Sequence, residues 1–329
     1  MTNIEMLCDT FPIASVIKGP PAHVRLGPLT QRLLSGPKWQ ESDSFPASQV
    51  WADDVESVLA FLDREGRLPA FLDNNRKTPT PQHRDASLAE ARAAYFLNQN
   101  CFRIVEWEPE GEGNKKGDAL VSYPGAPEIF VEVKQPGWRG EHMPLSTKDR
   151  NRLSLAEKEK FHRRKKQEKF LPDVIEAGTA APHRFSMSVV RRNALQKLSD
   201  KRPNVVIVVD DCIVSVVGLP FLAGYVQQEF LCPARNPDDP DDHWTYERLG
   251  GVLFLQPESR GTTVEYKVDF VVNPNVLPPC ALPLPVVSLF SKLRDITEER
   301  EKLRYACVPS FSEMLKKKWA RHGTNSRSS

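Results

Sequence analysis

The sequence lacks the cysteine spacings that metal ribbons and disulfide frameworks require. Its six cysteines are scattered over 329 residues without a C-x-x-C pair, which argues against both kinds of site and fits a reducing compartment. No apolar run approaches the roughly 18 residues that span a bilayer. Residues 1–20 have no basic start followed by an apolar stretch, so we expect no signal peptide and a cytoplasmic protein.

Several sequence patterns for binding phosphate or metal are also missing. The chain has no glycine-rich phosphate loop and no zinc finger, and its seven histidines show no ligand spacing. The acidic run at 238–242 lacks the glycine and the terminal Glu of a calcium loop, so we expect a flexible acidic loop there. Because the net charge is only +2, any affinity for nucleic acid has to come from a local basic patch.

What the chain does contain is typical of a globular protein, with 40% hydrophobic and 27% charged residues. Its length fits one large or two modest domains. We divide it into an N-terminal extension with one helix at 1–84, a core at 85–275, and a proline-rich linker, helix and disordered tail at 276–329.

Apolar periodicity and turn residues predict the order of the elements. Amphipathic spacing predicts helices, and β-branched runs predict strands, of which 205–209 is buried on both faces. A polar, proline-punctuated stretch at 72–83 predicts a linker. The predicted helices are 29–34, 52–64, 85–98, 153–170, 189–198 and 286–305, and the predicted strands are 101–107, 205–209 and a second hairpin at 252–255 and 264–272.

A first hairpin at 118–134 organises the rest. Residues 118–123 and 128–134 are rich in β-branched and aromatic residues, which favour strands. Residues 124–127 are Pro-Gly-Ala-Pro, which favours a turn between them. In the second strand Glu132 and Lys134 share one face with Phe130. Charged groups on a central strand are costly unless they are paired or bind a metal.

The register of this hairpin decides whether a second carboxylate joins Glu132. A three-residue loop of Pro124, Gly125 and Ala126 would place Asp118 directly opposite Glu132, on the same face of the sheet. Two carboxylates would then converge, with Lys134 one step along. Such a pair suits a divalent cation and a water molecule, since Mg²⁺ commonly takes one or two carboxylates plus phosphate oxygens.

The pattern resembles the PD-(D/E)xK phosphodiesterase superfamily of restriction endonucleases, junction resolvases and repair nucleases. The matching residues are Gly117 and Asp118, thirteen intervening residues, then Glu132-x-Lys134, and Gly117 replaces the first Pro of the family pattern. The context also agrees, because a helix and a strand precede the hairpin and a helix and an apolar strand follow it. The resemblance covers residues 85–211.

The resemblance implies an α/β fold with a restriction endonuclease-like core, in which helices flank a mixed central sheet. It implies a nuclease that depends on Mg²⁺, with Mn²⁺ able to substitute. Asp118, Glu132 and the carbonyl of Val133 would hold the ion, and Lys134 would orient the attacking water. DNA is the expected partner ahead of RNA, and a homodimer or a complex with other subunits stays open. The alternative is a silent nuclease-fold module that binds nucleic acid or protein.

Two further features have alternative interpretations. Superfamily members often carry a helical Glu that reaches the metal through water, and Glu90 is the candidate here. Ser87-x-x-Glu90 is also a capping box, in which Glu90 would bond the Ser87 amide.

The segment 148–169 has ten Lys or Arg against four Asp or Glu. Its densest cluster, at Arg163, Arg164, Lys165 and Lys166, is either a solvated helix face or a contact for nucleic-acid phosphates.

Overall fold

The computed structural model describes residues 16–17, 23–35, 45–46, 48–77, 81–111, 115–135, 197–209, 223–224, 226–227, 230 and 247–294. Within these residues the chain forms an α/β fold, as predicted, with a six-stranded mixed sheet, a separate two-stranded pair and five α-helices. The helices are α2 (Pro28–Leu34), α4 (Gln49–Arg64), α5 (Leu68–Lys77), α6 (Pro81–Gln99) and α11 (Leu284–Leu293). The strands of the large sheet are β3 (Arg103–Trp107), β4 (Ala119–Ser122), β5 (Ile129–Lys134), β6 (Asn204–Val209), β7 (Gly251–Arg260) and β8 (Thr263–Val272).

The strands of the large sheet follow one another in chain order, β3-β4-β5-β6-β7-β8. The β3-β4-β5 part and the β7-β8 hairpin are antiparallel, whereas β5, β6 and β7 run parallel. The short strands β1 (Val16–Ile17) and β2 (Phe45–Pro46) pair with each other outside this sheet. The order α6, β3, the β4-β5 hairpin and then apolar β6 is the order expected from the resemblance.

Both faces of the sheet are covered. On one face α6 and α11 pack against alternate residues of β4 to β8, including Val131, Ile207 and Phe270. On the other face Phe130 and the intervening residues of β6 and β7 form a second cluster. All six residues of β6 are therefore buried, which confirms the prediction that this strand is covered on both sides.

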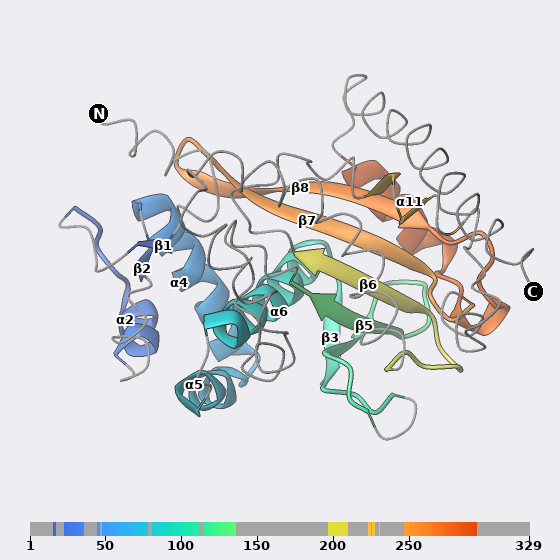
Figure 1. Cartoon of the computed structure of the whole chain (residues 1–329), viewed down its shortest axis with the longest axis horizontal. Coiled ribbons are helices and arrows are strands. Elements are labelled where there is room, and N and C mark those ends of the chain that lie inside the picture. The colour runs from blue at the N-terminus through green and yellow to red at the C-terminus, as the bar shows by residue number, and fades with distance from the viewer. Residues whose placement is uncertain are drawn as a thin grey trace, which may run out of the picture.

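A third apolar cluster joins α2, α4 and α5 to the outer face of α6. Figure 1 shows these three helices gathered at one end of the molecule, while α11 lies at the other end beside β8. The helix α6 thus lies between the N-terminal helices and the sheet. It contributes buried alanines to both sides, Ala89 and Ala93 toward the sheet and Ala91 and Ala94 toward the helices.

Two element boundaries differ from the sequence prediction. The predicted linker at 72–83 is wrong, because α5 runs to Lys77 and α6 begins at Pro81. Proline is favoured in the first turn of a helix, where its missing N–H costs nothing. Helix α11 ends at Leu293, within the helix predicted for 286–305, because Arg294 leaves the helical conformation with ψ of 122° and its guanidinium contacts Asp269 at 3.0 Å; residues 295–305 lie outside the described part of the chain.

Some predictions concern parts of the chain outside the described residues. They include the basic helix at 153–170, most of the helix at 189–198, the acidic loop at 238–242 and the C-terminal tail. The domain limits at 84 and 275 remain predictions. None of the described helices has the length and apolar character needed to cross a membrane.

Candidate active site

The β4-β5 hairpin has the predicted register. Ala119 pairs with Val131 and Val121 with Ile129, but the paired strand begins at Ala119 and the Asp118 N–H donates to the Val131 carbonyl over 3.1 Å, so the placement of Asp118 directly opposite Glu132 stays a prediction. The chain reverses through a turn in which the Ala126 N–H donates to the Tyr123 carbonyl over 3.0 Å. Pro124 and Gly125 occupy the centre, and Gly125 has φ of +73°, as a type II turn requires.

The two strands part at Asp118. The N–H of Val133 donates to Asp118 Oδ2 over 2.5 Å, so a side chain takes the place of a backbone carbonyl. The Gly117 N–H turns away and donates to the Pro109 carbonyl over 2.9 Å. Because the N–H and C=O of one strand residue point to the same side, the Val133 carbonyl also faces the gap beside Asp118.

Gly117 is required by the packing of the opposite strand. A Cβ added at this position would lie 2.2 Å from Cζ of Phe130, a contact that no side chain can make. A proline would also lose the N–H that bonds Pro109. Glycine at this position therefore has a local cause, and Phe130 packs against the backbone immediately before Asp118.

Glu132 is fully buried in the centre of the sheet. Its Oε1 accepts from Lys134 Nζ and from Lys197 Nζ at 2.8 Å. Its Oε2 is buried and has no hydrogen-bond partner. A buried carboxylate oxygen without a partner costs free energy, and this cost marks the position where a further positive group would be stabilising.

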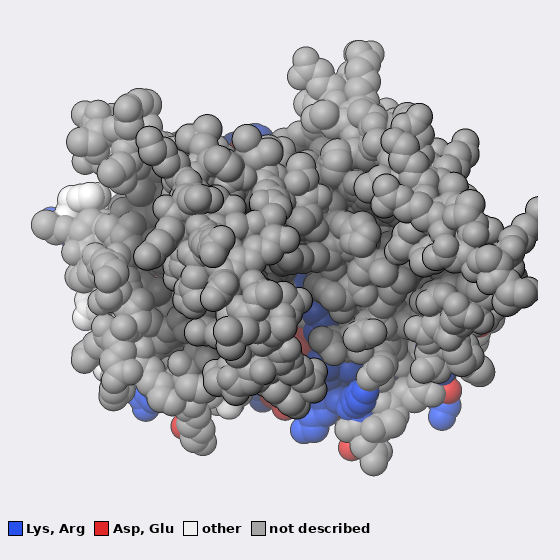
Figure 2. Space-filling model, in the orientation of Figure 1, with Lys and Arg blue, Asp and Glu red and all other residues white. Residues whose placement is uncertain are grey.

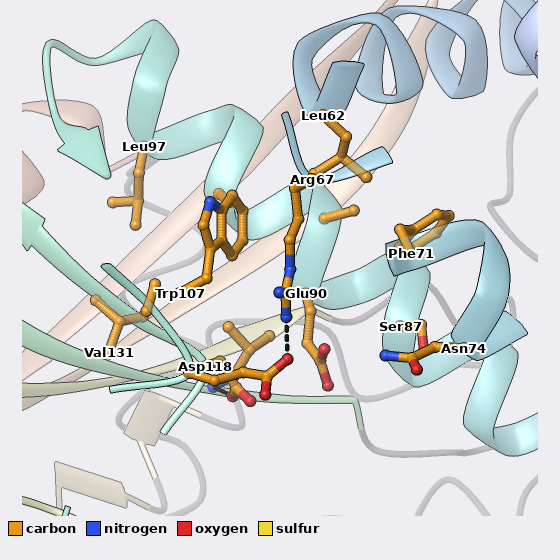
Figure 3. Close-up of a pocket in the computed structure, with 15 residues that line it drawn as sticks. Leu62, Arg67, Phe71, Asn74, Ser87, Glu90, Leu97, Trp107, Asp118 and Val131 are labelled. Carbon is orange, nitrogen blue, oxygen red and sulfur yellow. Dashed lines mark hydrogen bonds and ion pairs between the residues drawn. The ribbon is translucent and has the colours of Figure 1, made fainter. Parts of the chain in front are cut away.

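Glu90 approaches Asp118 from α6. Both line a cavity of about 70 Å³ whose walls are the side chains of α4, α5 and α6 and the start of β4. In Figure 3 the side chain of Glu90 extends toward Asp118, and the dashed line from Arg67 marks the ion pair of Arg67 with Glu108. Glu132 and Lys134 do not line this cavity, because alternation along β5 directs them to the other face of the strand.

The capping interpretation of Glu90 is wrong. Ser87 lies inside α6, which begins six residues earlier at Pro81, so its backbone N–H is not one of the unpaired donors of a helix start. The carboxylate of Glu90 is instead close enough to Asp118 and Glu132 for their charges to affect it. The structure thus brings the helical Glu to the hairpin carboxylates, and its proposed role there stays a prediction.

Burial and neighbouring charge raise the proton affinity of the carboxylates at this site. Burial, followed by the charge of Asp118, raises the pKa of Glu90 to about 8. Burial and then Asp118 likewise raise the pKa of Glu132 to about 7, against the lowering effect of Lys134 and Lys197. The pKa of Asp118 is also raised by burial, although the Val133 N–H and the lysines oppose this. A bound cation would relieve the cost of burying these negative charges and the repulsion of Glu90 and Glu132 by Asp118.

The oxygen donors at this site fit a hard divalent cation that takes only some of its ligands from the protein. Among the described residues no three His, Cys, Asp or Glu side chains form a ready cage for an ion. Mg²⁺ needs no such cage, because it is commonly bound by one or two carboxylates and keeps several waters. Asp118, the partnerless Oε2 of Glu132 and the Val133 carbonyl are the oxygen donors that this geometry offers.

Sequence reasoning missed Lys197, which contacts Glu132 from a position just before β6. Nothing in its spacing relative to the hairpin indicates the contact, because the two residues are distant in sequence and belong to no shared repeat. Burial alone would lower the pKa of Lys197, but its hydrogen bond to Glu132 and the nearby carboxylates raise it.

The predicted phosphate-binding cluster at 163–166 lies outside the described residues. Within them, Figure 2 shows Lys and Arg side chains gathered in the lower centre of one face, where Figure 1 draws β3 and β5, with Asp and Glu side chains beside them.

Comparison with known proteins adds little to this geometry. No protein-family model matches the chain, and no curated protein matches its sequence. The solved structure of Pyrococcus furiosus SfsA in complex with Ca²⁺ aligns with 59% of this chain at 12% identity and a TM-score of 0.21. The alignment covers 63% of that protein, so this chain spans less than two thirds of its length. A similarity at this level carries no functional argument.

Proposed function

We propose that this protein is a divalent-cation-dependent nuclease that hydrolyses phosphodiester bonds. One observation carries the proposal, the fully buried Glu132 carboxylate with lysines on Oε1 and no partner on Oε2. A charge kept in so costly a position beside a second carboxylate is expected where a cation completes the site. The preference for nucleic acid, and for DNA over RNA, comes from the resemblance of the hairpin to the PD-(D/E)xK superfamily.

Asp118, Glu132 and the Val133 carbonyl would hold Mg²⁺ or Mn²⁺. When bound, such an ion supplies an acidified water and neutralises negative charge on the reacting phosphate. The protein contributes a site that excludes bulk water, since Asp118 and Glu132 are both largely buried. Electrostatic interactions in such a site are stronger than in water.

Lys134 is the residue placed to act on the substrate. Its side chain is 19% exposed, so the ammonium group lies between the buried Glu132 carboxylate and solvent. There it would orient the attacking water and stabilise the non-bridging phosphate oxygens as the water oxygen bonds phosphorus and the ester P–O bond breaks. Glu90 would accept a hydrogen bond from a water on the cavity side of Asp118.

Cleavage of plasmid DNA by the purified full chain tests the proposal. We expect nicking or linearisation with Mg²⁺ or Mn²⁺, none with EDTA, and a loss of about 100-fold or more in Asp118→Asn, a magnitude typical of lost metal or acid-base assistance. Glu128→Gln is the matched control, because Glu128 is an exposed carboxylate of the same hairpin that pairs with Arg202. Plasmid DNA that stays intact when the wild-type protein is incubated with either cation contradicts the proposal. An Asp118→Asn variant of full activity contradicts it as well.

The basic cluster is the proposed path for the nucleic-acid backbone. Neutralising Arg163, Arg164, Lys165 and Lys166 together should weaken DNA binding and flatten its salt dependence, because fewer counterions are released. Asp118→Asn should bind as well as the wild type or better, since it relieves repulsion with phosphate. Filter binding at several salt concentrations measures both effects. An unchanged salt slope in the four-fold variant would place the DNA path elsewhere.

A further inference from the structure

A second lysine at the candidate site has no counterpart in the sequence pattern. Lys197 Nζ lies 2.8 Å from Glu132 Oε1, the same oxygen that Lys134 contacts. One ammonium group is enough to neutralise one carboxylate. The presence of two on a single oxygen, while the other oxygen has none, indicates that the two lysines have different tasks.

The backbone around Lys197 is fixed in place. Leu198 is fully buried in the cluster that contains Phe130. The Ser199 N–H donates to Asn204 Oδ1 over 3.0 Å, and Asn204 Nδ2 donates back to the Ser199 carbonyl over 2.7 Å. The backbone at Lys197 is therefore fixed by its buried neighbour Leu198 and by the two hydrogen bonds between Ser199 and Asn204. The backbone of an isolated surface lysine has no such constraints.

A close backbone contact confines Lys197 from the other side. The loop after β3 approaches so tightly that a Cβ added at Gly111 would lie 1.9 Å from the Lys197 carbonyl oxygen. The Gly111 N–H donates to the Lys115 carbonyl over 2.7 Å, which fixes that loop. The position of the Lys197 backbone thus depends on glycine at 111.

We propose that Lys197 is a positioning residue that holds Glu132 Oε1 while Lys134 leaves it for the substrate. This inference rests on the proposed function, because it assigns Lys134 to the phosphate. Lys134 shares β5 with Glu132, and Lys197 comes from a separately fixed segment. If Lys197 keeps Oε1 in place, the buried and unpartnered Oε2 keeps its position throughout the reaction.

The first test uses stability without any cation or DNA. Under this proposal either lysine alone can neutralise Glu132. Lys134→Ala and Lys197→Met should therefore each lower the melting temperature by only about a few degrees. The double variant leaves a buried carboxylate without a cation and should lose more than the sum of the two. Adding Glu132→Gln to the double variant should remove that excess loss. Additive single effects would overturn the inference.

The second test uses cleavage at saturating Mg²⁺ and DNA. Lys197→Met should lower kcat by about tenfold or more with little change in KM, a size typical of lost outer-shell partners, and Lys197→Arg should restore most of it. Lys201→Met, which removes an exposed lysine from the same segment, is the control.

A third variant leaves all charges in place. Gly111→Ala displaces the Lys197 backbone and should lower kcat in the same direction as Lys197→Met. If the wild type does not cut DNA, the proposed function fails while the stability cycle still decides whether Lys197 shares Glu132. If the wild type cuts and Lys197→Met turns over at the wild-type rate, the role of Lys197 is wrong and the proposed function stands.

Discussion

Two buried carboxylates of this chain are neutralised in different ways. Asp54 in α4 meets Arg92 of α6, which donates to a single oxygen, Oδ2, from Nε at 3.1 Å and from Nη2 at 2.8 Å. The Arg92 guanidinium also lies 5.6 Å from the centre of the Trp51 ring. Glu132 in β5 has two ammonium groups on one oxygen and none on the other.

The difference separates a carboxylate whose charge serves the packing of two helices, Asp54, from one that can still accept a further positive group, Glu132. A guanidinium is planar, weakly hydrated and stacks on aromatic rings, so the Asp54–Arg92 pair is suited to a permanent place between α4 and α6. An ammonium is a compact group on a flexible stem, and two of them leave Glu132 open to a third positive partner. Glu90 and Arg92 are two residues apart on α6, so the same helix contributes to both places.

Removing Lys134 from the Glu132 site should reduce cleavage more than any other change proposed below. We expect Lys134→Ala to lose about 10²- to 10⁴-fold in rate, the range for a group that assists proton transfer or charge development, and to remain folded. Lys267→Ala is the control, because Lys267 pairs with Glu258 in the same sheet and its side chain is 20% exposed, close to the 19% of Lys134. A Lys134→Ala enzyme that cuts at the wild-type rate would refute the assignment.

Removing Asp54 should break the structural pair. Asp54→Ala strips a buried guanidinium of its carboxylate and should cost about 3–5 kcal/mol of unfolding free energy. Glu132→Gln should change stability by only about 1 kcal/mol or less, because the amide ends the burial of a charge and the lysines reach solvent. Urea unfolding measures both. An equal loss in the two variants would show that Glu132 is a structural charge as well.

A pH series with and without cation sharpens the comparison further. Glu90 and Glu132 have pKa values of about 8 and about 7 in the folded chain, against 4.5 as ordinary values. The folded state therefore binds more protons between pH 4.5 and about 8, and the stability from these groups is lost as pH rises through that window. Mn²⁺ requires the deprotonated carboxylates, so its stabilising effect should be larger at pH 8.5 than at pH 6.

Melting temperatures at the two pH values, with Mn²⁺ or with EDTA, measure this effect. Glu132→Gln should abolish most of the difference that Mn²⁺ makes, whereas Glu128→Gln should keep it. A Mn²⁺ shift that is equal at both pH values, or unchanged in Glu132→Gln, would separate cation binding from these carboxylates.

Glu90→Gln should have the smallest effect on activity. Glu90 lies on the cavity side of Asp118 and is expected to act through water, so we predict a loss of about tenfold in cleavage, as for outer-shell partners. The melting temperature should hardly change. Turnover equal to wild type would remove Glu90 from the site.

The hairpin and its register could be predicted because local chemistry determines them. Pro124 and Gly125 specify the turn, and a shift by one residue would have exposed Val131 and Val133. The apolar run of β6 was equally clear. These features depend on residues close in sequence, and together they bring Asp118 close enough to Glu132 for its charge to raise the pKa of Glu132.

The missed features depend on contacts between distant residues. The start of α6 was misplaced because Pro81 was taken as a sign of a loop, although α6 gains its stability from packing Ala91 and Ala94 against the helices before it. Lys197 reaches Glu132 because β5 and β6 pair in parallel, and no local pattern reveals which side chain arrives beside that strand. The capping interpretation of Glu90 failed for the same reason, since it required the wrong start of α6.

The contact between Gly117 and Phe130 has a consequence for recognising related sequences. Any side chain with a Cβ at position 117, proline included, is excluded here by the aromatic ring two residues before Glu132, so relatives of this chain that share the ring should share the glycine. We expect the two positions to vary together, glycine with a large ring and a bulkier residue with a small side chain. Phe130→Ala should accordingly make Gly117→Ala tolerable, an exchange of volume across the hairpin that a search profile could encode as a pair.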